Sequence, residues 1–457
     1  MTKRYSLNPR VILRYEPQYY GTYAAFDCDA ARTELLSEDE YKILESVQAK
    51  RSDAGEISEE TSIRLRKCER FLDRMHKLGY VEANTSDFRT QPRELAKVDS
   101  TRYTQFIMPF LSAPTSVDLF ITSRCNLNCV HCFSSTADQT VYELSVEEVQ
   151  SILGQLERLR VLQLRINGGE PLLHPQIDKI LTTLRDMRFS KSMLTNGTVL
   201  DEERVRLLRD SAVTPTVSLD DSNAEGHDLF RGVEGSYERT IESLKLLQRH
   251  GVQFGINCCL HKRNLRDHKE IIDLALRHGA CRITFLDLVP SPRMKKNIEW
   301  IPSHNEYLEV LPDLMLDRIR YSRRIDVALD TFLTCQPLKE AISEARRGYV
   351  CCQAGRNRLS IGSNGVIYPC SLVMFDPRWD MGNIRSETIA DAWFSKKWSF
   401  FRGEVKTNDL RECAHCEDLR TCRDFYCRLS PYLDSGDLYG PSPGCRHNAV
   451  RNVKEEA

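Results

Sequence analysis

The sequence lacks three features that would assign it to particular classes of protein. No apolar run approaches the ~18 residues that a membrane-spanning helix requires. The first residues, MTKRYSLNPRVILRYEP, contain no apolar stretch before a small-residue cleavage site, as a secretory signal would. The formal net charge is −1, from 64 basic and 65 acidic residues, so no strong field favours nucleic acid or an acidic substrate. We therefore expect a cytoplasmic protein with neither a nucleic-acid nor a membrane partner.

What the chain does have is length and cysteine. At 457 residues it is too long for one ordinary core, so two or three domains are expected. It contains 17 cysteines, and in a cytosolic protein clustered cysteines are more often metal ligands or catalytic groups than disulfides. Ten of them fall into two groups. The others are scattered and are expected to be mostly buried thiols: Cys28, Cys68, Cys258, Cys259, Cys281, Cys335 and Cys351.

The most informative motif is a loop with three cysteines. Cys125, Cys129 and Cys132 lie in the string CNLNCVHC, directly after the strand-like run Ser116–Thr122. A 4Fe–4S cluster has four irons, each of which binds a thiolate. Three cysteines on one loop fill three of these positions and leave one iron open for a small chelating molecule. A zinc knuckle is the alternative, but zinc needs a fourth ligand nearby, and His131 is too close in sequence to serve easily.

From about residue 116 to residue 290, short apolar runs alternate with longer amphipathic ones. A helix is predicted over Ser145–Arg160, where Ser145 and Glu148 form a capping box. Such β-α repeats build a parallel sheet with covering helices, a full or partial barrel whose ligands lie at the carboxyl ends of the strands. The predicted strands are Ser116–Thr122, Val161–Asn167, Lys191–Gly197, Thr214–Asp220, Val252–Leu260 and Cys281–Val289.

Polar motifs follow these strands in order. Two glycines after the second strand permit close backbone approach, and the adjacent carboxylate can accept hydrogen bonds from an ammonium group. An arginine after the fourth strand can pair with a carboxylate through two hydrogen bonds. Each motif alone is also typical of an ordinary turn. Their order along the chain, each after a predicted strand, is what indicates a binding site. They comprise Gly168, Gly169 and Glu170, then Thr195, Asn196 and Gly197, then Ser218, Asp220 and Arg231, and then Asn257 and Asn264.

The cysteine spacing, with His131 before the last cysteine and these motifs downstream, resembles the radical S-adenosylmethionine enzymes over about 200 residues. The resemblance implies a role for each group. Cys125, Cys129 and Cys132 would hold the catalytic 4Fe–4S cluster. S-adenosylmethionine would be bound by Gly168, Gly169, Asn196, Glu170 at the methionyl amine, Arg231 at the carboxylate, and Ser218 and Asp220 at the ribose.

A second group of cysteines lies near the C-terminus and resembles the SPASM module, which binds two auxiliary 4Fe–4S clusters. The interval before Cys427 has four residues where the module usually has three. A zinc ribbon is the alternative, since C-x2-C pairs are typical of it. By resemblance, Cys352, Cys370 and Cys427 hold the nearer cluster and Cys413, Cys416, Cys422 and Cys445 the distal one. The fourth ligand of the nearer cluster is left open between Cys351, Cys335 and none.

Residues 1–95 contain none of this chemistry. Strands are predicted at Val11–Glu16, Thr22–Asp27 and Ala31–Leu36, and helices at Ser37–Gln48 and within Ser58–Ala83, the last ending in a short strand or turn at Gly79–Val81. This order suggests a winged helix, but the charge is mixed and no dense basic recognition helix is present, which disfavours a DNA-binding one. The segment resembles the peptide-recognition element of ribosomal-peptide maturation enzymes, in which a sheet edge captures a leader peptide as an added strand.

The combined expectation is an α/β chain with a partial (β/α)6 TIM-like barrel over residues 116–335. A winged-helix-like α+β domain occupies residues 1–95, a linker residues 96–115, and a cysteine-rich iron–sulfur domain residues 336–457. This layout resembles radical S-adenosylmethionine/SPASM peptide maturases of the sactionine, or thioether, type. The resemblance implies S-adenosylmethionine and three 4Fe–4S clusters as cofactors, a ribosomal precursor peptide bound through its leader, and an electron donor such as flavodoxin or ferredoxin.

The expected reaction is hydrogen abstraction from a peptide carbon by a 5′-deoxyadenosyl radical, followed by a bond from cysteine sulfur to that carbon. The cofactor supplies the difficult chemistry and the protein orients it. Three alternatives remain open at this point: a carbon–carbon or other crosslink, a folded protein as substrate, and, more distantly, an iron–sulfur regulator that binds DNA.

The cysteine loop generates a direct prediction. Replacement of Cys125, Cys129 and Cys132 together by alanine should abolish cleavage of S-adenosylmethionine, because no site for the open-iron cluster remains. Iron content should fall by about one third of a three-cluster total. Iron analysis and chromatography of 5′-deoxyadenosine measure both effects. Continued formation of 5′-deoxyadenosine by the triple variant would contradict the assignment.

Overall fold

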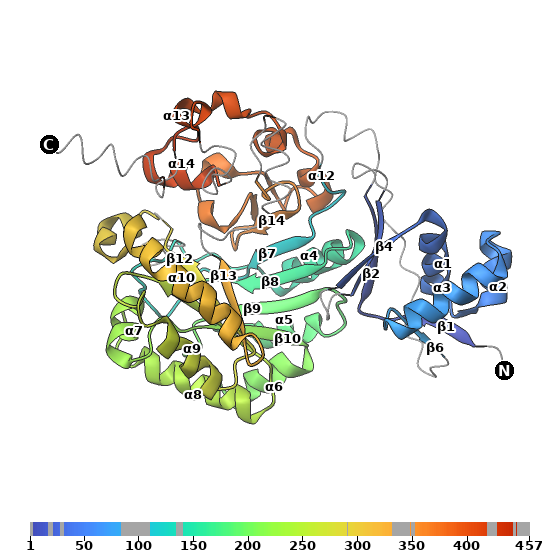
Figure 1. Cartoon of the computed structure of the whole chain (residues 1–457), viewed down its shortest axis with the longest axis horizontal. Helices are drawn as coiled ribbons and strands as arrows, with labels where there is room; N and C mark the ends of the chain where they lie inside the picture. Colours follow the sequence, from blue (N-terminus) through green and yellow to red (C-terminus); the bar gives the residue numbers. More distant parts are fainter. Residues whose placement is uncertain are drawn as a thin grey trace.

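The computed structural model describes residues 3–16, 22–27, 32–83, 110–133, 140–289, 291–330, 348, 352–417, 427–441 and 445. Predictions for Cys335, Cys351, Cys422 and residues 96–109 of the linker lie outside the described residues. Three parts are visible in Figure 1: an N-terminal module of strands and helices, a central sheet with its helices, and a C-terminal part. No described helix has both the length and the apolar character needed to cross a membrane.

The central sheet contains ten strands, seven of which pair in parallel in chain order from β7 to β13. Each strand predicted between residues 116 and 289 forms, with ends that differ by a few residues. The last strand, β13, was not predicted and extends the expected six. The strands are β7 (Ser116–Phe120), β8 (Gln163–Asn167), β9 (Ser190–Thr195), β10 (Val213–Ser218), β11 (Gly255–Leu260), β12 (Arg282–Asp287) and β13 (Asp326–Asp330).

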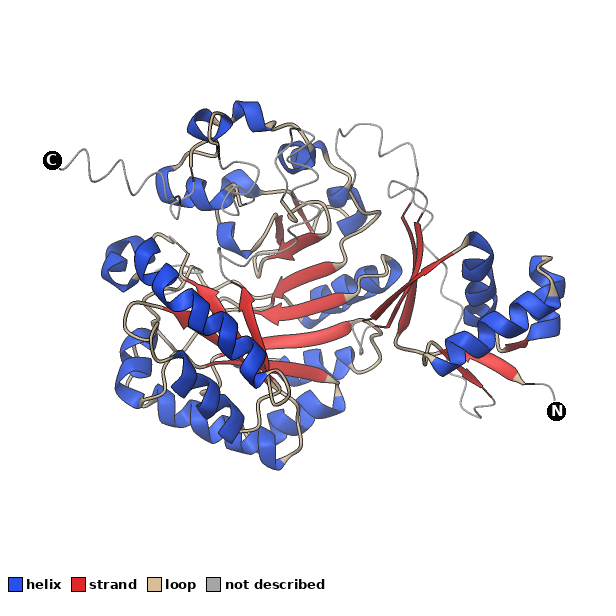
Figure 2. Ribbon diagram, in the orientation of Figure 1, coloured by secondary structure: helices blue, strands red, loops and turns tan. Residues whose placement is uncertain are grey.

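Helices alternate with these strands and lie along the outer side of the curved sheet (Figure 2). The first, α4, begins with the predicted capping box, in which the Ser145 hydroxyl accepts from the Glu148 amide and the Glu148 carboxylate accepts from the Ser145 amide. The helices are α4 (Val146–Arg158), α5 (Ile177–Leu184), α6 (Glu202–Asp210), α7 (Ala224–Arg231), α8 (Ser236–Arg249), α9 (His268–Arg277) and α10 (His304–Tyr321), with short 3-10 helices η2 (Pro171–Leu173) and η3 (Met294–Trp300).

The C-terminal part continues the same sheet. Strand β14 (Arg358–Ile361) pairs in parallel with β7, so that Ser360 lies opposite Asp118. Strands β15 (Val366–Tyr368) and β16 (Gly382–Asn383) then follow in antiparallel fashion. One buried apolar cluster includes side chains of both parts, among them Leu119, Ile361 and Trp393. The barrel and the cysteine-rich part therefore share a sheet and a core. The remaining helices here are η4 (Ser371–Val373), η5 (Pro377–Trp379), α12 (Ile389–Trp393), η6 (Lys396–Arg402), η7 (Thr407–Asp409), α13 (Arg411–Ala414) and α14 (Leu429–Ser435).

The N-terminal module has two three-stranded sheets and a core of its own. The three predicted strands form one sheet in the order β2-β3-β4. The region predicted as helical from residue 58 is interrupted at Ser62, whose φ of 60° ends a helix in the left-handed region. Short strands β1 and β5 were not predicted, and β6 forms next to the strand or turn predicted at Gly79–Val81. The elements are β1 (Arg4–Leu7), β2 (Val11–Glu16), β3 (Thr22–Asp27), β4 (Arg32–Leu36), α1 (Glu38–Ala49), β5 (Ser52–Asp53), α2 (Ala54–Thr61), α3 (Leu65–Lys77) and β6 (Val81–Ala83).

A buried ion pair fastens this module to the barrel. On β2, the Arg14 guanidinium contacts the Glu16 carboxylate at 2.5 Å and donates to the carbonyls of Ala113 (2.8 Å) and Pro114 (3.3 Å). Glu16 in turn accepts from the amide of Ser112 at 2.7 Å. Both charged side chains are at most one tenth exposed. A buried pair needs such additional hydrogen bonds to offset its desolvation, and here they come from the segment that enters the barrel.

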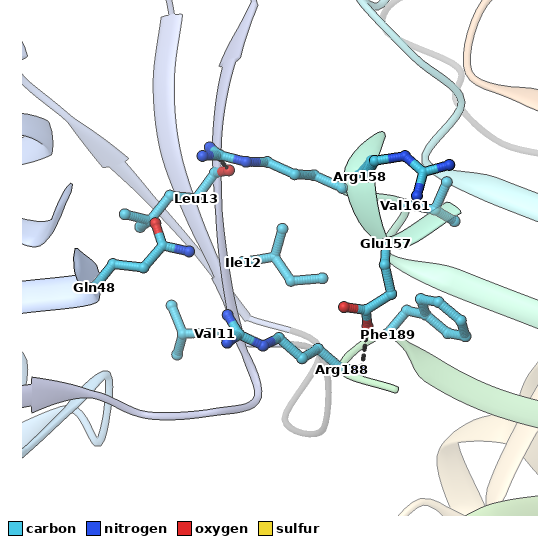
Figure 3. Close-up of a pocket in the computed structure, with 10 residues that line it drawn as sticks. Val11, Ile12, Leu13, Gln48, Glu157, Arg158, Val161, Arg188 and Phe189 are labelled. Carbon is cyan, nitrogen blue, oxygen red and sulfur yellow. Dashed lines mark hydrogen bonds between the residues drawn. The ribbon is translucent and has the colours of Figure 1, made fainter. Parts of the chain in front are cut away.

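A second contact between the N-terminal module and the barrel lies just after the end of α4. Arg160 donates to the carbonyl of Leu13 and, at 2.9 Å, to the hydroxyl of Tyr41. Figure 3 shows the seam between β2 and the barrel. A cavity of about 40 Å³ lies in it, room for a water molecule but not for a substrate. Its lining is Val11, Ile12, Leu13, Gln48, Glu157, Arg158, Arg160, Val161, Arg188 and Phe189.

We expect Arg14→Met to destabilise the chain by about 3–5 kcal/mol, because it leaves the Glu16 carboxylate buried without a counter-ion. Denaturant unfolding followed by circular dichroism measures this. The control is Arg4→Met, which removes the exposed Arg4–Glu56 pair and should cost at most about 1 kcal/mol. Equal effects of the two substitutions would show that the Arg14 contact does not hold the module in place.

Candidate active site

The loop after β7 brings the three predicted thiols into one neighbourhood. Burial, with smaller contributions from the nearby Cys129 and Cys132 thiols, raises the pKa of Cys125 to about 12. Cys129 is buried, and its carbonyl accepts from the Cys132 amide at 3.3 Å. The Leu127 amide donates to the Cys125 sulfur at 3.5 Å. Three thiols on one loop, close enough to influence one another electrostatically, are a donor set of the kind that binds three of the four irons of a 4Fe–4S cluster.

The two glycines after β8 lie directly against this loop. The Gly169 amide donates to the carbonyl of Thr122 at 2.9 Å, and the Glu170 amide donates to the carbonyl of Arg124 at 2.6 Å. A Cβ atom on Gly169 would lie 2.3 Å from the Arg124 oxygen, and one on Gly168 would lie 2.7 Å from the Thr122 oxygen. Only glycine permits this approach. The predicted close approach of backbone is therefore present, and it joins the glycine turn to the cysteine loop.

Glu170 has a different environment from the one we expected. It is fully buried, and its carboxylate accepts from the Asn196 amide (2.7 Å), the Thr195 hydroxyl (2.8 Å) and the Leu172 amide (3.1 Å). Burial raises the pKa of Glu170 to about 7, although these hydrogen bonds oppose the shift. Both carboxylate oxygens are thus engaged by protein. Glu170 therefore ties the ends of β8 and β9 together.

Asn196 links the end of β9 to the cysteine loop. Its side-chain amide donates to the side chain of Asn126 at 2.9 Å, and Asn126 donates to the hydroxyl of Thr198 at 2.8 Å. Asn196 also accepts from the Thr198 amide at 2.8 Å. Asn126, which lies between two of the cysteines, was not predicted as a site residue. A polar residue within a metal-binding loop has no spacing signal of its own.

A buried ion pair stands beside the second cysteine. Arg231 donates to the Asp220 carboxylate at 2.5 Å and to the Cys129 sulfur at 3.7 Å. The other Asp220 oxygen accepts from the Cys259 amide at 2.9 Å. Burial alone would raise the pKa of Asp220, but the charge of Arg231 outweighs it and holds that pKa at about 2. Arg231 is therefore fixed as a cation next to the cysteine loop.

Asp220 lies in a different environment from the one we expected. Its side chain is fully buried and both oxygens accept hydrogen bonds from protein groups, so it is the counter-ion of Arg231. Ser218, at the end of β10, is half-buried, so part of its surface is accessible to solvent. Asn264 donates to the carbonyls of Asp220 (2.6 Å) and Cys259 (2.8 Å), behind the ion pair. Asn257, on β11, pairs in register with Ser218.

An aromatic stack lines the loop on one side. The rings of His131 and Phe230 are stacked with centroids 4.4 Å apart and planes 6° from parallel. Phe230 also contacts His261 (4.4 Å) and Trp300 (5.4 Å), and the Arg263 guanidinium lies 4.5 Å from the Trp300 ring. Burial lowers the pKa of His131 to about 3, so the ring is neutral at pH 7. Phe230, His261 and Trp300 were missed because they are far apart in sequence and meet only in the fold.

The C-terminal cysteines fall into two sets. Burial raises the pKa values of Cys370 and Cys427, to about 12 for Cys427; the thiols of Cys427 and Cys352 contribute to the shift of Cys370, and that of Cys352 to the shift of Cys427. Burial also raises the pKa of Cys413, with contributions from Cys445 and Cys416. Cys422 lies outside the described residues. In the part of the chain that the structure describes, no group of three or more His, Cys, Asp or Glu side chains has the spacing to hold a single metal ion.

The glycine turn makes a testable prediction. Gly169→Ala should displace the cysteine loop, because the added methyl group overlaps the Arg124 carbonyl. Reconstituted protein should then lose about one third of its iron and its cleavage of S-adenosylmethionine. The control is Gly154→Ala within α4, where the nearest atom is 3.6 Å away and helix propensity favours alanine. Iron content equal to that of the parent protein would show that the turn does not set the loop position.

Comparisons with known proteins agree with this geometry. The sequence model of the radical SAM superfamily matches residues 119–275, and that of the SPASM iron–sulfur cluster-binding domain matches residues 351–417. The AdoMet-dependent heme synthase of Methanosarcina barkeri is 30% identical over 353 residues, which are 73% of this chain and 97% of that protein. The mycofactocin maturase MftC of Mycobacterium tuberculosis is 28% identical over 73% of this chain and 83% of its own.

Among solved structures, Streptococcus suis SuiB bound to its precursor peptide SuiA superposes with a TM-score of 0.71, with 16% identity, over 97% of this chain and all of SuiB. The same enzyme bound to S-adenosylmethionine also has a TM-score of 0.71, over 96% of this chain. At these identities the likeness concerns the fold, and it extends over all three parts. The chain belongs to the radical SAM superfamily, as an enzyme that uses S-adenosylmethionine and a 4Fe–4S cluster and that carries a SPASM domain for auxiliary iron–sulfur clusters.

Proposed function

We propose that this enzyme matures a ribosomally made precursor peptide by joining a cysteine sulfur to a carbon of another residue. The observation that carries the proposal is the N-terminal module, which is fastened to the barrel through Arg14 and Glu16 and presents an open sheet edge. Its fold is shared with SuiB, and MftC is among the relatives of the chain. A module that binds a leader peptide would serve the reaction only if the substrate is a peptide, so its presence favours a peptide substrate.

The open edge is strand β4. Among the described residues, β4 pairs only with β3, so one side of its backbone is available. Arg32 and Thr33 are exposed, and Leu35 has 70% of its surface in solvent. An extended leader can add to such an edge through main-chain hydrogen bonds, with side-chain contacts for specificity. Leu35 is suited to an apolar leader side chain, since it is large, apolar and uncovered.

In the barrel, Cys125, Cys129 and Cys132 would hold the catalytic cluster, and the Gly168–Gly169 turn would offer backbone oxygens to the methionyl amine. Arg231 would turn one N–H toward the methionyl carboxylate while Asp220 keeps its charge balanced. Ser218 would meet the ribose. When bound, the reduced cluster and S-adenosylmethionine together supply a 5′-deoxyadenosyl radical that removes a hydrogen atom from a substrate carbon. The neutral His131–Phe230 stack excludes water from this side of the loop.

In the SPASM domain, Cys352, Cys370 and Cys427 would hold the nearer auxiliary cluster, and Cys413, Cys416, Cys422 and Cys445 the distal one. Cys370 follows β15, which pairs antiparallel with β14 at the edge of the sheet that contains β7, so the nearer set lies along the same sheet as the catalytic loop. That placement suits an acceptor for the electron that bond formation releases. A flavodoxin or ferredoxin would supply the reducing electron.

A tetrapyrrole substrate is the second candidate, because the heme synthase relative aligns over nearly all of its length. The alignment leaves part of this chain without a counterpart in that relative, because it covers 73% of this chain and 97% of the relative. We favour the peptide because this chain has that additional part. The test combines enzyme, S-adenosylmethionine and reductant with a cysteine-containing precursor peptide or with an iron porphyrin. Thioether formation should remove two hydrogens from the peptide and block alkylation of one cysteine. A carbon–carbon crosslink would leave that cysteine reactive, and modification of the porphyrin alone would contradict the proposal.

The proposed leader site on β4 leads to a testable prediction. Leu35→Asp should reduce modification of the full-length precursor at least tenfold, because a charge replaces the apolar contact on β4. Cleavage of S-adenosylmethionine without peptide should be unchanged. Leu65→Asp is the matched control, an exposed leucine on α3 away from the edge. Mass spectrometry of the precursor beside 5′-deoxyadenosine chromatography separates the two activities. Equal modification by the parent enzyme and the Leu35 variant would exclude β4 as the leader site.

A further inference from the structure

A buried arginine lies between the two sets of C-terminal cysteines. Arg428 directly follows Cys427, which belongs to the nearer set, and it immediately precedes α14. The residue is only 1% exposed. Its guanidinium interacts with the thiol of Cys413 on α13, which belongs to the distal set, and more weakly with the thiol of Cys427. One cation therefore stands next to both sets of sulfurs.

Two backbone carbonyls fix the position of the guanidinium. Arg428 donates from Nε to the carbonyl of Leu438 at 2.9 Å and from Nη2 to the carbonyl of Gly440, both in the segment after α14. Its third nitrogen, Nη1, is buried and has no hydrogen-bond partner in the part of the chain that the structure describes. Buried donors in proteins are nearly always paired, so this one points to an acceptor that arrives with a bound group.

The charge of Arg428 is also incompletely balanced. Asp437 is close enough to influence it, but its carboxylate pairs with Arg411 at 3.0 Å. Burial lowers the pKa of Arg428, because it removes a cation from water and the surrounding groups only partly offset that cost. Arg231 beside the catalytic loop differs, since Asp220 balances its charge at 2.5 Å. A buried cation needs a negative partner, and a cysteine that binds a metal supplies one as a thiolate.

The sulfurs near Arg428 fit such a partner. The amide of Cys416 donates to the carbonyl of Cys413 at 3.1 Å, so these two cysteines lie on one tight turn. The thiols of Cys445 and Cys416 both contribute to the pKa of Cys413. Several thiolates gathered in one place, as a 4Fe–4S cluster requires, provide the negative charge that Arg428 lacks.

We propose that Arg428 is a positioning residue of the distal auxiliary cluster: it donates from Nη1 to the iron-bound sulfur of Cys413 and raises the reduction potential of that cluster. This inference rests on the assignment of Cys413 to the distal cluster under the proposed function. Reduction adds one electron, and hence one negative charge, to the cluster. A cation and a hydrogen-bond donor at a ligating sulfur therefore stabilise the reduced state more than the oxidised state.

Redox titration followed by electron paramagnetic resonance measures this effect. The background is the reconstituted full-length chain with Cys125, Cys129 and Cys132 replaced by alanine, so that only the auxiliary clusters give signals. The signal that changes in Cys413→Ser identifies the distal cluster. At a fixed potential, Arg428→Met should lower its ratio of reduced to oxidised cluster at least tenfold, about 59 mV for a one-electron couple. Arg428→Lys keeps the charge and should recover most of the shift.

The matched control is Arg411→Met, which removes a cation two residues from Cys413. Because the Arg411 side chain is 66% exposed, water and salt screen its charge. The same ratio should therefore change much less than in Arg428→Met. An equal shift in the two variants would show that the contact of Arg428 with Cys413 has no special effect, and would overturn the proposal.

Isotope labelling provides a measurement that does not depend on replacing Arg428. Protein made with arginine carrying nitrogen-15 in its guanidinium should show a nitrogen-15 hyperfine coupling in the reduced distal cluster by pulsed electron paramagnetic resonance. The labelled Arg428→Lys protein should lose it. This measurement decides the question if Arg428→Met fails to bind the cluster.

Absence of the coupling would overturn the proposal, as would an unchanged potential in fully loaded Arg428→Met. If Cys413→Ser altered neither auxiliary signal, the ligand assignment would fail and this proposal with it. None of these measurements uses a peptide. An enzyme that shows the coupling and the shift but forms no thioether would therefore contradict the proposed function alone.

Discussion

The site depends on a positive charge that is buried next to the cysteine loop. Arg231 has little access to water, and it can remain charged there only because Asp220 contacts it at 2.5 Å. Asp220 is in turn held by the Cys259 amide at the end of β11. A buried charge without a partner is costly, so the two residues form one unit. That unit stands beside Cys129 and so places a fixed cation where thiolates and a carboxylate are expected to gather.

The backbone around this charge leaves little freedom. Gly168 and Gly169 place the turn after β8 against the carbonyls of the cysteine loop, and Asn196 ties the turn after β9 to Asn126 within the loop. Glu170 joins the two turns, because its carboxylate accepts hydrogen bonds from the Thr195 hydroxyl and the Asn196 amide. The loop is therefore held from several strand ends at once. This favours a constant position for its three sulfurs, because each anchor comes from a rigid strand.

The larger arrangement follows from continuity of secondary structure. Strand β14 adds to the edge of β7, so the sheet that ends in the catalytic loop also begins the cysteine-rich domain. At the other side, β2 contacts the barrel through Arg14 while β4, two strands away, remains open. The N-terminal module is thus fixed by one edge and free at the other. A peptide held at β4 would be kept near the barrel without blocking the strand ends where the chemistry takes place.

Local signals in the sequence were sufficient for the parts of this protein that depend on spacing. The order of strands from Ser116 to Val289, the Ser145–Glu148 capping box and the turn at Gly168–Gly169 follow from patterns that neighbouring residues make by themselves. The three-cysteine spacing likewise indicates its chemistry without any long-range contact. The hydrogen-bond partners of Glu170 and Asp220 did not follow from such patterns. Whether a carboxylate faces a ligand or a neighbouring residue depends on which groups from other strands reach it.

The tertiary structure alone decided the pairing of β14 with β7, the buried Arg14–Glu16 contact and the stack of His131, Phe230, His261 and Trp300. Apart from the Arg14–Glu16 pair itself, whose long-range contacts are those with residues 112–114, these contacts join segments tens to hundreds of residues apart, and nothing in a local pattern records such a distance. It also decided that the apolar residues of α10 divide between a covered and an uncovered face, because a helical pattern shows periodicity but not which neighbours are present. The sequence by itself determined which elements form and which chemistry they bring, and the tertiary structure decided which polar groups are used up inside the fold and which remain free.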